Sequence, residues 1–257
     1  MNTTGNTILI TGGGSGIGRG LAEAFHKLGN HVIIAGRRKQ VLDKTVAANP
    51  GMSSAVLDIE NAASIRAFAT KLIADFPALN AVIHNAGIMR PENLLAQPEG
   101  LADAEAIITT NLLGPIRLTA ALLPHLEKQP HAAILNVTSG LAFVPLAMTP
   151  TYNATKAAIH SYTQALRYQL KSTKVQVIEL VPPYVQTELM GSQQASDPRA
   201  MPLADYLNET INLLKTQPDA TEILVERVKP LRFSEQNGLE KHTAFFNQFN
   251  DAMSANH

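Results

Sequence analysis

TILITGGGSGIG, residues 7–18, predicts a buried strand that passes through a glycine-rich turn into a helix. Gly12 permits the tight exit from the strand, Gly16 lets the backbone approach a pyrophosphate closely, and Gly18 lets the helix pack near the sheet. The N-terminus of that helix carries partial positive charge, which favours a phosphate. Glycine-rich runs also occur in ordinary loops, so the strand and helix on either side are what make this one indicate a dinucleotide site.

Short apolar segments bounded by turn-forming residues recur along the chain and alternate with amphipathic ones. The predicted strands are Thr7–Ile10, His31–Ala35, Ser54–Leu57, Ala81–His84, Ala132–Val137 and Val175–Val181. The predicted helices are Ile17–Leu28, Lys39–Ala48, Ala62–Phe76, Ala102–Leu126 and Tyr152–Leu170. Parallel strands joined by right-handed crossovers predict one α/β domain over residues 1–257, a doubly wound parallel sheet flanked by helices on both faces.

The last third of the chain is less regular. The polar segment Gln186–Pro202 predicts a mobile cover over the site, which we extend to about residues 186–215. The tail after Asp219 is apolar enough to pack, but Pro230 interrupts any long helix. We therefore expect one more strand or short helices there.

Composition narrows the class of function. The chain has 21 basic and 21 acidic side chains, so its charge favours neither nucleic acid nor a membrane surface as a partner. It has no cysteine, which excludes disulfides and thiolate chemistry, and no acidic or histidine cluster that predicts a metal. The first apolar run, Ile8–Ile10, is too short for a signal peptide or a membrane span, so we expect a cytoplasmic protein.

The end of the second predicted strand indicates which dinucleotide is bound. Gly36 stands where such folds place an acid that binds the adenosine ribose 2'-hydroxyl. Arg37 and Arg38 follow, and a guanidinium can form charge-assisted hydrogen bonds with a 2'-phosphate. This pattern favours NADP(H) over NAD(H). The alternative is that both arginines are only solvated at a helix start.

A second cluster supplies candidate acid–base chemistry. Ser139 follows a predicted strand, and Tyr152 and Lys156 share one face of a predicted helix. A tyrosine hydroxyl has an ordinary pKa of about 10, so it needs a neighbouring cation to act near neutrality. Lys156 is placed to supply that cation, and Ser139 to orient a substrate oxygen. Taken alone, a Tyr-x-x-x-Lys pair is more often structural.

Together, TGGGSGIG, HNAG at residues 84–87, Asn111, Ser139 and YNATK at 152–156 resemble the classical short-chain dehydrogenase/reductase family. The resemblance covers about residues 7–187, and the tail ILVERVKPLRF resembles the DltE-like subgroup. It implies a sheet of about seven strands in the order 3-2-1-4-5-6-7. The implied catalytic residues are Asn111, Ser139, Tyr152 and Lys156. The implied cofactor-binding residues are Gly12, Gly14, Ser15, Gly16, Ile17, Gly18, Arg37, Arg38, Asp58, Ile59, Asn85, Ala86, Gly87, Tyr152, Lys156, Pro182, Val185 and Thr187.

The sequence departs from the family pattern at two places. His84 replaces the commoner asparagine before Asn85, and we interpret it as a buried, hydrogen-bonded histidine. Pro183 stands where the family usually has glycine, which stiffens the turn beside the nicotinamide.

The resemblance implies hydride transfer between a nicotinamide and the carbonyl or secondary alcohol of a small molecule, with Tyr152 as general acid or base. The apolar loop GLAFVPLAMTPT at residues 140–151 predicts a largely apolar substrate. The apolar surplus of Ala102–Leu126 predicts a homodimer or homotetramer. A catalytically silent NADP(H)-sensing protein on the same fold is the alternative from another class, and an epimerase or dehydratase is the alternative among enzymes.

Overall fold

The computed structural model describes residues 1–95 and 100–254. Its centre is a seven-stranded sheet in the order β3-β2-β1-β4-β5-β6-β7, with every neighbouring pair parallel. The strands are β1 Thr7–Thr11, β2 His31–Gly36, β3 Ser53–Val56, β4 Leu79–His84, β5 Ala132–Val137, β6 Val175–Val181 and β7 Glu222–Leu224. The strand order and the doubly wound class are those expected from the sequence, and both predictions are confirmed.

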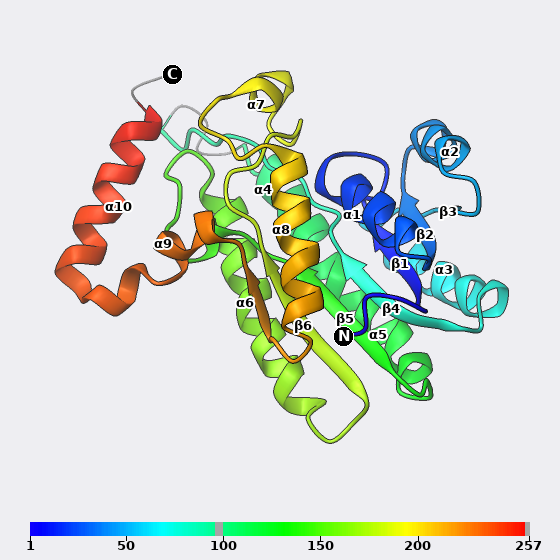
Figure 1. Cartoon of the computed structure of the whole chain (residues 1–257). Coiled ribbons are helices and arrows are strands. Elements are labelled where there is room, and N and C mark those ends of the chain that lie inside the picture. The colour runs from blue at the N-terminus through cyan, green and yellow to red at the C-terminus, as the bar shows by residue number, and fades with distance from the viewer. Residues whose placement is uncertain (96–99, 255–257) are drawn as a thin grey trace.

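Helices cover both faces of this sheet (Figure 1). The face formed by Ile8 and Ile10 of β1 packs against Phe25 of α1, and the face formed by Leu9 packs against Leu118 of α5. Alternate residues of one strand are thus buried on opposite sides, which explains the continuous apolar runs of the sequence. The first layer contains α1 Gly16–Lys27, α2 Lys39–Ala48 and α8 Leu203–Thr216; the second contains α3 Ala62–Asp75, α5 Gly114–Leu126 and α6 Pro150–Gln169.

The predicted helix Ala102–Leu126 is interrupted by a wider turn. It consists of α4 Ala102–Ile108, a π-helical turn Thr109–Leu113, and α5. By length and composition alone the whole run could span a membrane. Its residues Ile107, Leu118, Leu122 and Leu126 are buried within the protein, however, so it is a core helix of the α/β fold.

The segment expected to be a mobile cover is only partly irregular. Residues 186–202 contain the short helix α7 Ser192–Ser196, but the following residues form α8, in which Tyr206, Thr210 and Leu214 are buried. The part of the predicted cover after residue 202 is therefore a packed helix of the first layer. Its buried positions recur every four residues, as one helical face requires.

The tail contains both kinds of element that the sequence predicted. Strand β7 extends the sheet, and α9 Lys229–Arg232 carries Pro230 near its start, where a proline is tolerated. One element is longer than expected. After Gly238, the helix α10 Leu239–Ser254 stands apart from the two helical layers, beside the β7 end of the sheet (Figure 1).

Candidate active site

The glycine-rich turn follows β1 directly and folds back beneath the end of β4. Gly12 has a φ of 69°, and a Cβ there would lie 2.9 Å from the Cα of Ala86. A Cβ on Gly18 would lie 2.4 Å from the carbonyl oxygen of Gly12 and 2.3 Å from Nδ2 of Asn85. Only glycine fits these two positions, because any side chain would collide with neighbouring backbone.

The turn presents an uncapped helix end. Ser15 is the N-cap residue of α1, yet its side chain makes no capping hydrogen bond, and the first turn of α1 holds no acid. The first N–H groups of a helix need acceptors, and the helix dipole makes this end partly positive. A pyrophosphate satisfies both requirements, so the residues present fit the phosphates of a dinucleotide cofactor.

The segment after β4 is fastened to β1. The Asn85 side chain donates from Nδ2 to the carbonyl oxygen of Thr11 at 3.1 Å. The Thr11 hydroxyl in turn accepts the backbone N–H groups of Asn85 and Ala86, each at 3.1 Å. These contacts fix the floor of the cleft between the two strands and hold Ala86 and Gly87 at the carboxyl edge of the sheet.

The two arginines after β2 differ in their surroundings. Nη1 of Arg37 donates to Oε1 of Glu60 at 2.8 Å, and both side chains are partly exposed. Arg38 precedes α2 and is exposed. Asp58 lies after β3 and is also exposed, and its carboxylate accepts the backbone N–H of Glu60 at 3.1 Å. The residues predicted to bind the adenosine therefore lie exposed after the carboxyl ends of β2 and β3.

Tyr152, Lys156 and Ser139 meet at the carboxyl end of β5. Tyr152 and Lys156 occupy the first turns of α6, and Nζ of Lys156 lies 5.5 Å from the centre of the Tyr152 ring. Lys156 donates from Nζ to the carbonyl oxygen of Val137 at 2.8 Å. Ser139 follows two residues later and hydrogen-bonds the Tyr152 hydroxyl. All three side chains are nearly inaccessible to solvent, with exposures of 6%, 6% and 8% respectively.

Burial shifts both titrating groups. It raises the pKa of Tyr152 to about 12, because the phenolate would lose its hydration, and the hydrogen bond with Ser139 partly offsets this rise. Burial also lowers the pKa of Lys156 to about 8, against an opposing pull from the negative charge of Glu179. Tyr152 therefore holds its proton at neutral pH, and Lys156 can exchange its proton close to it.

Asn111 lies in the π-helical turn, where the wider spacing turns its side chain toward the segment after β4. Its Oδ1 accepts the N–H of Ile88 at 2.9 Å, and its Nδ2 donates to the Ile88 carbonyl at 2.9 Å. Nδ2 also lies 3.3 Å from the hydroxyl of Thr155, which donates to the carbonyl oxygen of Tyr152 at 2.7 Å. Asn111 thus connects the floor of the cleft to α6.

The covering segment lies against the glycine turn. The Thr187 side chain would be 3.5 Å from a Cβ on Gly16, so it lies beside the start of α1. Gln194, which sequence reasoning missed, is buried and donates from Nε2 to the Val185 carbonyl at 2.8 Å and to the Thr187 hydroxyl at 3.1 Å. Pro182 contributes its carbonyl oxygen, which accepts the N–H of Gly140 at 2.9 Å.

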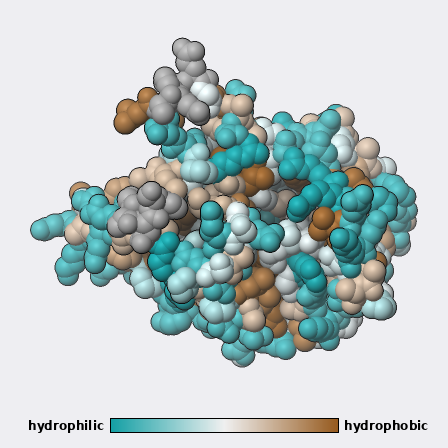
Figure 2. Space-filling model, turned by 90° about the horizontal axis from the view of Figure 1, so that it is seen from above, coloured by the Kyte–Doolittle hydropathy of each residue, from teal (hydrophilic) through white to brown (hydrophobic). Residues whose placement is uncertain are grey.

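The predicted site residues that follow β1, β2, β3, β4 and β5 therefore gather at one edge of the sheet. Figure 2 views the molecule from this side and shows mixed hydrophilic and hydrophobic side chains around a hollowed centre. Carboxyl ends of parallel strands are where open α/β sheets bind ligands.

The loop between Ser139 and Tyr152 is braced by the tail of the chain. Asn250 of α10 accepts the N–H of Ala147 at 2.6 Å and donates to the Pro145 carbonyl at 3.1 Å. The ring of Phe143 packs edge-on against His160 with its centre 4.7 Å away, and the Arg232 guanidinium lies 4.6 Å above the same ring. Phe143 thus belongs to the packing of the loop against α6 and α9.

His84 is buried, as its sequence context indicated. Its exposure is 4%, and its Nε2 lies 2.9 Å from the hydroxyl of Thr119 on α5. Burial without a charged partner lowers the pKa of His84 to about 3, so the ring is neutral. It is a structural residue beneath the site.

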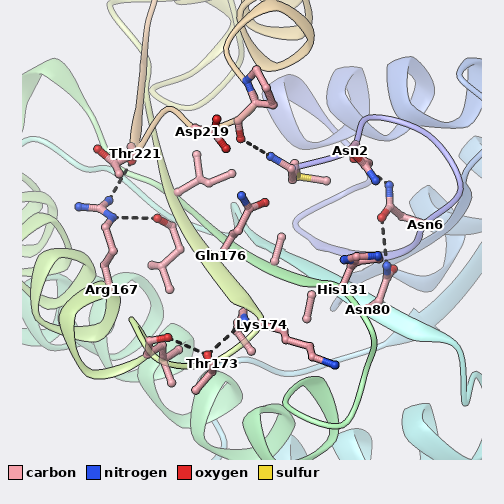
Figure 3. Close-up of a pocket in the computed structure, with 18 of the residues that line it drawn as sticks. Asn2, Asn6, Asn80, His131, Arg167, Thr173, Lys174, Gln176, Asp219 and Thr221 are labelled. Carbon is pink, nitrogen blue, oxygen red and sulfur yellow. Dashed lines mark hydrogen bonds between the residues drawn. The ribbon is translucent and has the colours of Figure 1, made fainter.

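A cavity of about 900 Å³ lies at the other edge of the sheet (Figure 3). None of the predicted site residues lines it. Its polar groups bond one another: Asn80 donates to Asn6 at 3.0 Å, and Arg167 donates to the Thr221 carbonyl at 2.8 Å. The buried Tyr152 and Lys156 side chains lie instead at the carboxyl edge.

Comparisons with known proteins show the family of the chain. The family model for short chain dehydrogenases matches residues 6–198. An uncharacterized oxidoreductase of Bacillus subtilis, DltE, is 40% identical over 90% of this chain and 92% of its own. Sulfoacetaldehyde reductase 2 of Chromohalobacter salexigens is 32% identical over 74% of this chain and 79% of its own. A Burkholderia cenocepacia short chain dehydrogenase in complex with NADP superposes with a TM-score of 0.82 at 24% identity, over 96% of this chain and 99% of that one.

Proposed function

The chain belongs to the short-chain dehydrogenase family and is an NAD(P)-linked oxidoreductase, and on that premise we propose that it interconverts a carbonyl and a secondary alcohol on a small, largely apolar substrate with NADP(H) preferred. The observation that carries the proposal is the buried meeting of Tyr152, Lys156 and Ser139 at the carboxyl end of β5. One relative is named as an aldehyde reductase, which supports a carbonyl as the group that reacts.

A bound nicotinamide supplies the hydride in reduction and accepts it in oxidation. In reduction, Tyr152 donates its hydroxyl proton to the carbonyl oxygen as that oxygen gains negative charge. Burial supports this role, since a phenol with pKa of about 12 remains protonated until that charge develops. Ser139 hydrogen-bonds the same oxygen and orients it toward Tyr152. Oxidation of the alcohol follows the same steps in reverse.

Lys156 supports Tyr152 electrostatically and holds the ribose next to the nicotinamide in this proposal. Its ammonium lies 5.5 Å from the tyrosine ring centre, close enough to stabilise a phenolate formed in the reaction. Asn111 holds the start of α6 against the cleft floor through Thr155. Its contacts keep the two catalytic side chains at a fixed distance from the cofactor.

Preference for NADP(H) rests on the residues after β2. Gly36 offers no carboxylate to a 2'-hydroxyl, and two guanidinium groups follow it. Arg38 is the better candidate for the 2'-phosphate, because Arg37 is already paired with Glu60. Arg37 would then hold the Glu60 carboxylate away from the surface that binds the adenosine.

Titration of the purified protein with NADPH and with NADH, followed by nicotinamide fluorescence, tests the cofactor assignment. A panel of apolar ketones and aldehydes is then added to the NADPH complex, and loss of absorbance at the reduced nicotinamide band reports turnover. We expect tighter binding of NADPH and its oxidation by at least one carbonyl. Tight binding without turnover across the panel would favour the NADP(H)-sensing alternative.

The expected cytoplasmic location and homo-oligomeric state stay predictions. Light scattering coupled to gel filtration tests the second, and a monomer at every protein concentration would contradict it.

A further inference from the structure

A row of four polar residues crosses the sheet at one level. His84 of β4 pairs in register with Asn136 of β5, Asn136 pairs with Glu179 of β6, and Glu179 pairs with Glu222 of β7. Register partners of parallel strands point to the same face, so all four side chains face the α5 and α6 side. On that side their hydrogen-bond partners include Thr119, Thr163, His160 and Arg232, in the same order.

Glu179 is the most deeply buried acid of this row. Its exposure is 0%, and it interrupts the apolar strand VQVIELV. Its carboxylate lies 2.8 and 2.9 Å from Nδ1 of His160 and accepts the Thr138 hydroxyl at 2.7 Å. A buried carboxylate loses its hydration unless hydrogen bonds replace it, and these two contacts supply hydrogen bonds.

Both partners of Glu179 adjoin the catalytic centre. Thr138 is bonded to Ser139 in the chain and follows Val137, whose carbonyl accepts the Lys156 ammonium. His160 lies one helical turn after Lys156 on α6, so the two side chains share a face of that helix. The carboxylate of Glu179 therefore connects the end of β5 to the face of α6 that carries Lys156.

The negative charge of Glu179 also raises the pKa of Lys156. It opposes the loss of the Lys156 proton that burial would otherwise cause, and it is the main electrostatic influence on that pKa. The charged or titratable groups around the Glu179 carboxylate are Lys156 and His160 of α6, Glu222 of β7 and Arg232 of α9. Arg167, two turns further along α6, acts on Glu222. Glu222 is neutralised by its pair with Arg232 at 2.6 Å, which leaves Glu179 as the acid acting on Lys156.

We propose that Glu179, held by His160 and Thr138, is a positioning residue of this site that keeps the Lys156 ammonium charged and fixed against the end of β5. The proposal rests on the function proposed above, since it assigns Glu179 a role through Lys156. Glu179 touches neither substrate nor cofactor.

The test compares Glu179→Gln with Glu179→Asp in the full-length protein. The Lys156 side-chain resonance is followed from pH 6 to pH 11 by carbon NMR of lysine-labelled protein, and its loss in Lys156→Arg assigns it. We expect the midpoint of the Lys156 titration to fall by at least about one pH unit in Glu179→Gln, because the buried opposite charge is gone. Glu179→Asp should restore most of the shift.

Glu222→Gln is the matched control, since it removes the same charge from the same row and leaves the Lys156 midpoint unchanged in our account. Circular dichroism and thermal melting check that each variant is folded. An unchanged Lys156 midpoint in folded Glu179→Gln would overturn the proposal, and so would an equal shift in Glu222→Gln.

Turnover separates this proposal from the proposed function. If the wild type oxidises NADPH with a carbonyl, the alkaline limb of kcat/KM in Glu179→Gln should move to lower pH, together with the Lys156 midpoint. If the wild type binds NADPH without turnover while the midpoint still shifts, the proposed function fails and the role of Glu179 in holding the lysine charge stands. If turnover is normal and the midpoint does not move, only the Glu179 proposal fails.

Discussion

Lowering the pH should destabilise this protein through the buried imidazole of His84. His84 has a folded-state pKa of about 3, against an ordinary value of 6.5, because its imidazole is buried; within residues 1–95 and 100–254 its hydrogen-bond partner is the Thr119 hydroxyl. Between these two pKa values, the unfolded chain therefore binds a proton at His84 that the folded chain does not bind. Stability from this residue is complete above pH 6.5 and is lost as the pH falls from 6.5 toward 3.

The magnitude follows from the size of the shift. A difference of about 3.5 pH units at about 1.36 kcal/mol per unit gives a maximum of about 5 kcal/mol, which is reached below pH 3. Between pH 7.5 and pH 5 the loss is about 2 kcal/mol, a large part of the 5 to 15 kcal/mol that typical domains possess.

Urea unfolding followed by circular dichroism at pH 7.5, 6.5, 5.5 and 5 measures this loss, at one fixed protein concentration because an oligomer would add its own dependence. His84→Asn removes the titration, so its free energy of unfolding should fall by about 2 kcal/mol less than that of the wild type over this range. His31→Asn is the control, since it removes an exposed histidine and keeps the buried one. Equal falls for the wild type and His84→Asn would refute the reasoning.

Three further predictions concern the site. Tyr152→Phe removes the proton donor and keeps the ring, so we expect kcat to fall at least about a hundredfold with the Kd for NADPH little changed; full activity would contradict the catalytic assignment. Arg38→Ala should weaken NADPH binding by about tenfold or more and NADH binding much less, measured by fluorescence titration beside Arg37→Ala, and equal losses for both nucleotides would leave the preference unexplained. Gly18→Ala should lower stability by about 1 to 3 kcal/mol in thermal melts, because its Cβ would overlap Gly12, whereas Gly36→Ala, whose Cβ would find its nearest neighbour at 3.8 Å, should be tolerated.

The sequence predicted those parts of the fold that depend on local pattern. The strands were recognisable because β1, β2, β4, β5 and β6 are buried on both faces and read as short apolar runs. Helix α8 was assigned to a mobile cover because the polar residues before it suggested a loop, although Tyr206, Thr210 and Leu214 already had helical spacing. Packing against the sheet decides the structure there, and the mobility of the cover stays a prediction.

The candidate site divides in the same way. Tyr152, Lys156 and the glycine turn could be predicted because their chemistry requires fixed spacings within one element. The pairing of Glu179 with His160 was missed, since it joins a strand to a helix through tertiary contact. One signal did exist in the sequence, namely a glutamate within an otherwise apolar strand. A buried acid in such a position requires a partner, and asking for that partner would have led to α6.

The contact of α10 with the loop before Tyr152 has a consequence for how new activities arise on this scaffold. The family model ends at residue 198, whereas the helix that braces Pro145 and Ala147 begins at Leu239. Under the proposed function, the segment that braces the substrate loop is therefore separate in the chain from the segment that carries out proton transfer. Insertions, deletions or exchanges in the tail can alter which molecules are admitted and leave the acid–base machinery untouched. Selection can thus act on substrate range and on chemistry as two nearly independent traits of one gene.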